Sequence, residues 1–254
     1  MGYYDLSPIQ RKQLYEQMQN NIIRNLKENK ADIIMSHASD PDTYIRKNCS
    51  LILGRLYNDD EGLRKPISEV IDKLSVSENE KIRLTTVYAL GEIGKNNFRA
   101  VEQKLEKFLT DSHHSVKNAL TGALKQMGEK NPEPVFHWAK KAMNSCNPDM
   151  RKRILHGLEL RGRSHPEELL PILKNIIQGN PDKKTRGMIV HIIGQISYKK
   201  GCLEIVLKEL KKWDDNGFLR ECGKEIIKVH HSYERFSALS VREAQGMLVK
   251  FGIL

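Results

Sequence analysis

Apolar residues recur along the chain at helical spacing in six segments that share one pattern. Each segment is anchored by an early basic residue: Arg46, Arg83, Lys117, Arg151, Arg186 and Arg220. Apolar side chains stand mostly one position before this anchor and three, seven and ten positions after it. These positions share one face of a helix with 3.6 residues per turn. The pattern predicts six amphipathic helices, each buried along one face.

The anchors follow one another at intervals of 37, 34, 34, 35 and 34 residues, with a shorter amphipathic stretch between each pair. Each unit is therefore predicted to be a hairpin of two helices. One hairpin cannot bury its own apolar face, so stacked neighbours must complete the core. We expect an all-α fold, a right-handed α-solenoid of about six hairpins with helical caps.

The predicted solenoid forms a single domain over residues 1–254. Residues 7–29 are expected to form an amino-terminal capping helix, residues 30–235 the six repeats, and residues 236–254 a carboxy-terminal cap. Ser240 followed by Glu243 has the spacing of a capping box, in which each residue's side chain bonds the other's backbone N–H. The last helix is therefore predicted to begin beside Ser240.

Three of the segments carry a family resemblance. The stretches DTYIRKNCSLILGRL, EKIRLTTVYALGEIG and DSHHSVKNALTGALKQMG resemble HEAT repeats, with an acidic residue, an aliphatic-basic pair and then a Leu-Gly pair. The resemblance covers roughly residues 30–235 and implies a HEAT-type solenoid. It says little about function, because HEAT arrays bind partners of many kinds.

A narrower resemblance covers residues 112–178. The stretches SVKNALTGALKQMGEKNPEPVFHW and RKRILHGLELRGRSHPEELLPIL are similar to the HEAT-like DNA alkylation-repair proteins. That family implies a basic face that holds duplex DNA, and some members are alkylpurine glycosylases. The active glycosylases carry Trp at the position of Gly122 and Arg at that of Lys125, and their Trp-Trp-Asp element has no counterpart here. The resemblance thus implies the fold and the DNA cradle, and no catalytic residue is predicted.

The formal net charge is +10, and its distribution matters more than its size. Residues 117–212 contain 19 Lys and Arg against 9 Asp and Glu, whereas the rest of the chain contains 23 of each. A concentrated positive field attracts polyanions such as nucleic acid. We therefore expect non-catalytic binding of nucleic acid along a surface built by the third to fifth repeats, and the resemblance implies duplex DNA and a DNA-repair setting.

Twelve basic residues are candidates for contact with the phosphates of nucleic acid. They are Lys117, Lys125, Arg151, Lys152, Arg153, Arg161, Arg163, Lys183, Lys184, Arg186, Lys199 and Lys200. Binding through phosphates should weaken steeply with salt, because counterions are released. The anchors among these residues have a second interpretation, a structural ladder in which each pairs with an acid of the preceding turn, such as Asp42, Glu80, Asp149 or Asp182.

Other candidate sites are weaker. Glu159 is the one acid in an Arg-rich helix, and a pair with Arg163 one turn later is its simplest interpretation. His156 and His191 each follow their anchors by five residues and are expected to lie close together, but no third metal ligand stands at a suitable spacing. Gly54, Gly91 and Gly194 each follow an anchor by eight residues, which indicates close helix packing. No metal and no cofactor is predicted.

Two alternatives to DNA binding stay open, a protein-interaction scaffold and an alkylpurine glycosylase. The scaffold predicts a protein partner and weak DNA binding, and the glycosylase predicts release of a damaged base that depends on Glu159. No apolar run approaches the roughly 20 residues that span a membrane, so a membrane partner is not expected. The four cysteines lack zinc or redox spacing and suit free thiols in the cytoplasm.

Overall fold

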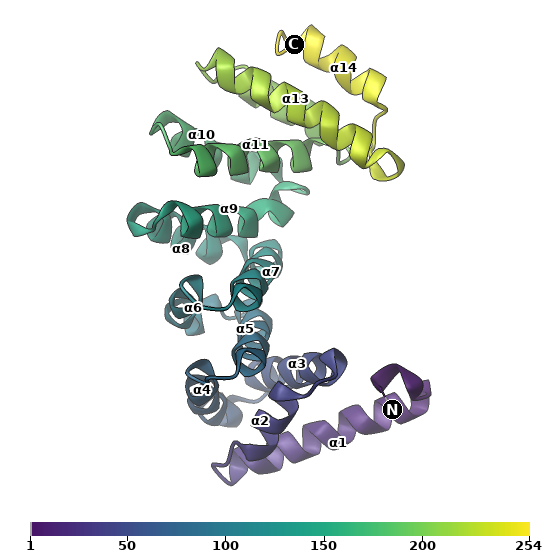
Figure 1. Cartoon of the computed structure of the whole chain (residues 1–254), viewed down its shortest axis with the longest axis vertical. Coiled ribbons are helices and arrows are strands. Elements are labelled where there is room, and N and C mark those ends of the chain that lie inside the picture. The colour runs from purple at the N-terminus through teal and green to yellow at the C-terminus, as the bar shows by residue number, and fades with distance from the viewer. Residues whose placement is uncertain (1) are drawn as a thin grey trace. The chain divides into compact units, whose positions relative to one another are not determined.

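The computed structural model describes residues 2–254, which form fourteen α-helices and three short 3-10 helices with no β-strand (Figure 1). The all-α fold predicted from the sequence is confirmed. Two compact units divide the chain between Val135 and Phe136. The prediction that residues 1–254 act as a single domain stays a prediction.

The first unit stacks three helical hairpins behind a long first helix. Its helices are α1 (Pro8–Lys27), α2 (Asp32–Ser39), α3 (Thr43–Asp59), α4 (Glu61–Ser75), α5 (Glu80–Gly94), α6 (Glu102–Leu109) and α7 (His114–Lys130). The anchor helices α3, α5 and α7 pack side by side, and α1 packs against α2, α3 and α4. Helix α1 lies within residues 7–29, and three helical hairpins follow it in this unit.

The second unit continues the pattern. Its helices are α8 (Pro132–Ser145), within which the unit boundary falls, α9 (Pro148–Gly162), α10 (Pro166–Gln178), α11 (Lys183–Ser197), α12 (Cys202–Leu210), α13 (Asn216–Ser232) and α14 (Val241–Lys250). The anchor helices α9, α11 and α13 form one layer, and α10, α12 and α14 pack along one another beside it.

The apolar column seven residues after each anchor lies in the core. Its members Leu53, Leu90, Leu124, Leu158 and Ile193 are fully buried, and Ile227 in the last repeat is half-buried. Burial of one such side chain stabilises the fold by roughly 1.5–3 kcal/mol. The regular spacing of these residues explains why each hairpin requires its neighbour.

Three of the anchor arginines, Arg83, Arg151 and Arg186, form a ladder of ion pairs between repeats. In the first unit, Arg83 donates from Nε and Nη2 to the Asp111 carboxylate at 2.7 and 3.0 Å. Its Nη1 also donates to the carbonyl oxygens of Ser77 and Glu78. Asp111 belongs to the next repeat, so the expectation of an acid from the preceding turn is wrong here.

The second unit repeats the ladder with the same direction along the chain. Arg151 lies 3.6 Å from Asp182, and Arg186 lies 2.8 Å from Asp215. Asp182 and Asp215 are also the N-cap residues of α11 and α13, where their side chains accept backbone N–H groups. Each acid therefore begins its own helix and holds the arginine of the preceding repeat.

The carboxy-terminal cap begins as predicted. The Ser240 hydroxyl accepts the Glu243 backbone N–H at 3.3 Å, and Glu243 accepts the Ser240 backbone N–H at 2.8 Å. We expect Ser240→Ala to destabilise α14 by about 1 kcal/mol, because the cap is lost. Amide hydrogen exchange along α14 measures this effect. Ser232→Ala is the control, and equal exchange in the two variants would contradict the expectation.

No helix among residues 2–254 combines the length and the apolar character that crossing a bilayer requires.

Candidate nucleic-acid interface

Basic residues gather where α9 and α11 begin. Lys184 donates from Nζ to Asp149 at 2.9 Å, which joins the first turns of the two helices. The Lys184 hydrogen bond and charge, followed by the charges of Arg153 and Lys152, hold the pKa of Asp149 below its usual value. Lys183 adjoins Lys184 and is exposed. We call Lys152, Arg153, Lys183 and Lys184 the amino-terminal basic cluster.

This cluster carries more positive charge than its neighbours neutralise. The side chains of Lys184 and Asp149 are 61% and 67% exposed, so their ion pair is in water and contributes little to stability. Lys152 and Lys183 are exposed and form no ion pair with any residue from 2 to 254. An anionic ligand could therefore contact Lys152, Lys183 and Lys184 without breaking a buried interaction.

The predicted candidates at the other end of these helices are more constrained. Arg161 donates to Glu168 of α10 at 2.8 and 2.6 Å, and this bidentate pair lowers the pKa of Glu168. Lys199 lies over the Tyr198 ring at 4.6 Å, and Lys200 is exposed. The surplus charge at this end thus comes mainly from the two lysines.

Arg163 is also held at this end. Its guanidinium donates to the carboxylate of Glu159 and, at 2.7 Å, to Gln195 of α11. It lies over the Tyr198 ring at 5.7 Å. The predicted pair of Glu159 with Arg163 is therefore confirmed.

The two anchors of this region serve the fold. Arg151 donates to the carbonyl oxygens of Met143 and Cys146, in addition to its pair with Asp182. Arg186 binds the carboxylates of Asp215 and Glu221, and these hydrogen bonds raise its pKa further above the usual value. The structural interpretation of the anchors is the one that these contacts favour.

The remaining candidates, Lys117 and Lys125, lie on α7 in the first unit. Both side chains are half-buried. They are thus grouped with the first unit, while the other ten candidates belong to the second.

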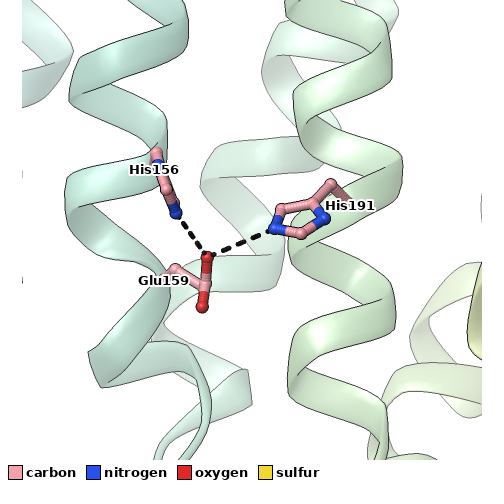
Figure 2. A group of neighbouring side chains, drawn as sticks. All are labelled: His156, Glu159 and His191. Atoms are coloured by element: carbon pink, nitrogen blue, oxygen red, sulfur yellow. Dashed lines mark ion pairs between the residues drawn. The ribbon is translucent and has the colours of Figure 1, made fainter. Parts of the chain in front are cut away.

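A buried carboxylate lies between two histidines on the α9 and α11 layer. Figure 2 shows His156 and Glu159 on α9 and His191 on α11, with both imidazole rings directed at one carboxylate oxygen. Glu159 Oε2 lies 3.2 Å from His156 Nε2 and 3.7 Å from His191 Nε2. The Glu159 residue is only 1% exposed, whereas the histidine side chains are 37% and 38% exposed.

The close approach of His156 and His191 across repeats is thus as the sequence predicts. The expectation that no third ligand is available is wrong, because Glu159 brings its oxygen within 4.8 Å of both imidazoles. The sequence does contain a signal for this ligand, because Glu159 stands three residues after His156 and therefore lies on the same face of α9.

The position of Glu159 in the repeat offers a signal. It stands eight residues after Arg151, where Gly54, Gly91 and Gly194 stand in other repeats. A Cβ at Gly194 would lie 2.8 Å from the Glu225 side chain, in keeping with the close packing predicted for these glycines. The third and sixth repeats have Lys125 and Lys228 at this position, half-buried and exposed, so Glu159 is the member of the column whose charged side chain is fully buried.

Comparison with known proteins identifies the fold. No family model matches the chain, and no curated protein matches it. The chain has the fold of AlkD2 from Streptococcus mutans. That structure aligns over 87% of this chain and 100% of its own, with a TM-score of 0.53 and 17% identity. A second structure, smu.31 from Streptococcus mutans UA159, aligns over 87% of this chain and 99% of its own, with a TM-score of 0.51 and 17% identity.

These similarities confirm the HEAT-like helical solenoid predicted from the sequence, together with the resemblance to the HEAT-like DNA alkylation-repair family at the level of fold. At 17% identity they carry the fold and not the chemistry of any site.

Proposed function

We propose that this protein binds duplex DNA without cleaving it, and that it does so through the amino-terminal basic cluster of α9 and α11. The observation that carries the proposal is the surplus of basic side chains around one exposed carboxylate, that of Asp149. Lys152, Arg153 and Lys184 all lower the pKa of Asp149, so four charged groups on two helices leave a net positive charge. Lys183 adds to it.

The size of the cluster suits a phosphate backbone. Packed helices lie about 8–10 Å apart, and duplex DNA carries one negative charge per roughly 1.7 Å of axis. Lysine and arginine side chains on two neighbouring helices therefore face several phosphates at once. Contacts of this kind position a duplex by its charge and shape and carry no sequence information.

Lys199 and Lys200 supply a second point of contact at the other end of α11. Lys184 lies near the start of α11 and Lys199 just after its end, a separation of about 20 Å, because the helix from Lys183 to Ser197 rises about 1.5 Å per residue. A duplex about as wide as this separation would reach both ends of the layer. The sequence resemblance to HEAT-like DNA alkylation-repair proteins and the AlkD2-like fold support a DNA-repair setting.

The test is a DNA titration at several salt concentrations with the variant Lys152→Glu/Lys183→Glu/Lys184→Glu. We expect a loss of affinity of about 100-fold, and a fall of about three in the slope of log affinity against log salt, because about one slope unit belongs to each phosphate contact. The matched control is Lys27→Glu/Lys65→Glu/Lys73→Glu, which changes the net charge equally on exposed lysines of the first unit.

Three outcomes would refute the proposal. If the wild type shows only weak, unsaturable binding, a protein-interaction scaffold is the better account. If both triple variants lose affinity equally, the binding follows net charge and not this cluster. If alkylated DNA loses its damaged base during incubation and Glu159→Gln abolishes that reaction, the protein is a glycosylase.

A further inference from the structure

We propose that His156, Glu159 and His191 form a binding site for a divalent transition-metal ion, with Zn²⁺ as the preferred ion. Two imidazole nitrogens and one carboxylate oxygen converge on a single point between α9 and α11 (Figure 2). This donor set suits Zn²⁺ and its neighbours better than Ca²⁺ or Mg²⁺, which prefer oxygen ligands alone.

The two distances from the Glu159 oxygen to the imidazole nitrogens lie close to those around a tetrahedral ion, and all three donor atoms lie within 4.8 Å of one another. Zinc bonds of about 2.0–2.2 Å to nitrogen and oxygen place neighbouring ligand atoms about 3.3–3.5 Å apart. Glu159 Oε2 lies 3.2 Å from His156 Nε2 and 3.7 Å from His191 Nε2. A movement of the half-exposed His191 ring by a few tenths of an ångström would bring the longer of these two distances into the range for zinc.

The carboxylate of Glu159 is divided between two tasks. Its Oε1 accepts from the Arg163 guanidinium, which Gln195 holds from the other side, and its Oε2 faces the two histidines. Because Arg163 is bound to the other oxygen, the carboxylate cannot rotate away from the proposed ion. A ligand fixed in this way binds without loss of side-chain freedom.

His191 has an outer partner of the kind that metal-binding histidines use. Its Nδ1 lies 3.6 Å from the Glu225 carboxylate on α13, and Lys228 holds Glu225 at 3.1 Å. Metal-ligating histidines almost always donate their second ring N–H to a carboxylate, a carbonyl or water, which fixes the tautomer. Three helices of one layer thus contribute to the site.

The exposure of the ligands indicates an open site. The side chains of His156 and His191 are 37% and 38% exposed, so an ion could reach Oε2 from solvent. Three protein ligands leave a fourth tetrahedral position for water or an anionic oxygen. If the proposed DNA binding holds, a phosphate oxygen is the anion that the nearby basic cluster would bring to this position.

The repeat pattern supplies an independent argument. A fully buried carboxylate stands at a position where three other repeats have a closely packed glycine and two have a lysine that is not buried, and residues that break a local rule are often functional. A plain ion pair with Arg163 would explain the charge of Glu159. It does not explain why two imidazoles from different helices face Glu159 Oε2.

The experiment titrates Zn²⁺ and Co²⁺ into the metal-stripped full chain without DNA, by calorimetry and by the visible absorption of tetrahedral Co²⁺. We expect about one ion per chain. His156→Ala and His191→Ala should each weaken binding by more than tenfold, and Glu225→Gln by about tenfold, since outer partners typically contribute 10–100-fold. His137→Ala, which removes an exposed histidine elsewhere in the second unit, should bind as the wild type does.

A second measurement requires no variant. Long-range ¹H–¹⁵N spectra of the histidine rings should show that Zn²⁺ shifts the resonances of His156 and His191 and leaves His137 unchanged. The proposal is overturned if the wild type binds no ion, if the double variant His156→Ala/His191→Ala keeps its affinity, or if only other histidines shift. Since DNA is absent throughout, failure here leaves the proposed DNA binding untouched. A change in the Co²⁺ spectrum on adding DNA would test the phosphate ligand separately.

Discussion

Replacing Asp111 with alanine should lower the free energy of unfolding by about 3–5 kcal/mol, the usual result of removing one partner from a buried ion pair. The side chains of Arg83 and Asp111 are 13% and 7% exposed and form two hydrogen bonds between repeats. Without Asp111, the Arg83 guanidinium keeps only carbonyl partners in a site that water hardly reaches. Urea unfolding at neutral pH measures the loss.

The same pair predicts a dependence on pH. Burial raises the pKa of Asp111, but the Arg83 hydrogen bond and the His113 backbone N–H lower it more, and the net direction is down. A carboxyl whose folded pKa is depressed contributes stability above its unfolded pKa of about 3.9, and loses that contribution as the pH falls through the folded value. The difference in the free energy of unfolding between the wild type and Asp111→Ala should therefore become smaller as the pH is lowered.

Asp72→Ala is the matched control in the same unit. Asp72 pairs with Lys104, but its side chain is 53% exposed, so its loss should cost less than about 1 kcal/mol. Equal losses in the two variants, or a gap that stays constant down to pH 3, would show that the ladder does not hold the repeats together.

The ladder also illustrates what the sequence could predict. The anchors and their period are visible because every hairpin buries the same face against its neighbour. The partner acids are not visible in the same way, because acids lie near every anchor in sequence, whereas Arg83, Arg151 and Arg186 pair with an acid of the following repeat. Asp111 stands 28 residues after Arg83, and only the stacking of hairpins makes it the nearer partner.

The candidate interface was predicted in part, for a related reason. Counting charges located the excess of lysine and arginine. It could not distinguish Lys183, which is exposed, from Arg161, whose guanidinium is bound by Glu168 of the following helix. Such pairings depend on which way a side chain leaves its helix. The proposed metal site shows the same limit, because His191 meets Glu159 only through helix packing.

Two glycines give a sharp test of the packing, because replacing them with alanine is expected to change the free energy of unfolding in opposite directions. A Cβ at Gly54 on α3 would lie 2.2 Å from the Glu92 Cβ and 3.3 Å from its Cα on α5, so the helices themselves must separate. Gly54→Ala should therefore lower the free energy of unfolding by about 2–3 kcal/mol. A Cβ at Gly122 on α7 would meet no atom within 4 Å.

Gly122→Ala should accordingly raise the free energy of unfolding by about 0.5–1 kcal/mol, because alanine loses less backbone entropy than glycine in a helix. Both residues lie in the first unit, and both changes add one methyl group. The midpoints of urea unfolding of the two variants, compared with that of the wild type, measure both changes in stability. If Gly54→Ala were neutral or stabilising, α3 and α5 would not be packed at the distance described, and the glycine column would have no packing role. Since Glu159 occupies that same column in the fourth repeat, its accommodation there requires α9 and α11 to be arranged differently from α3 and α5.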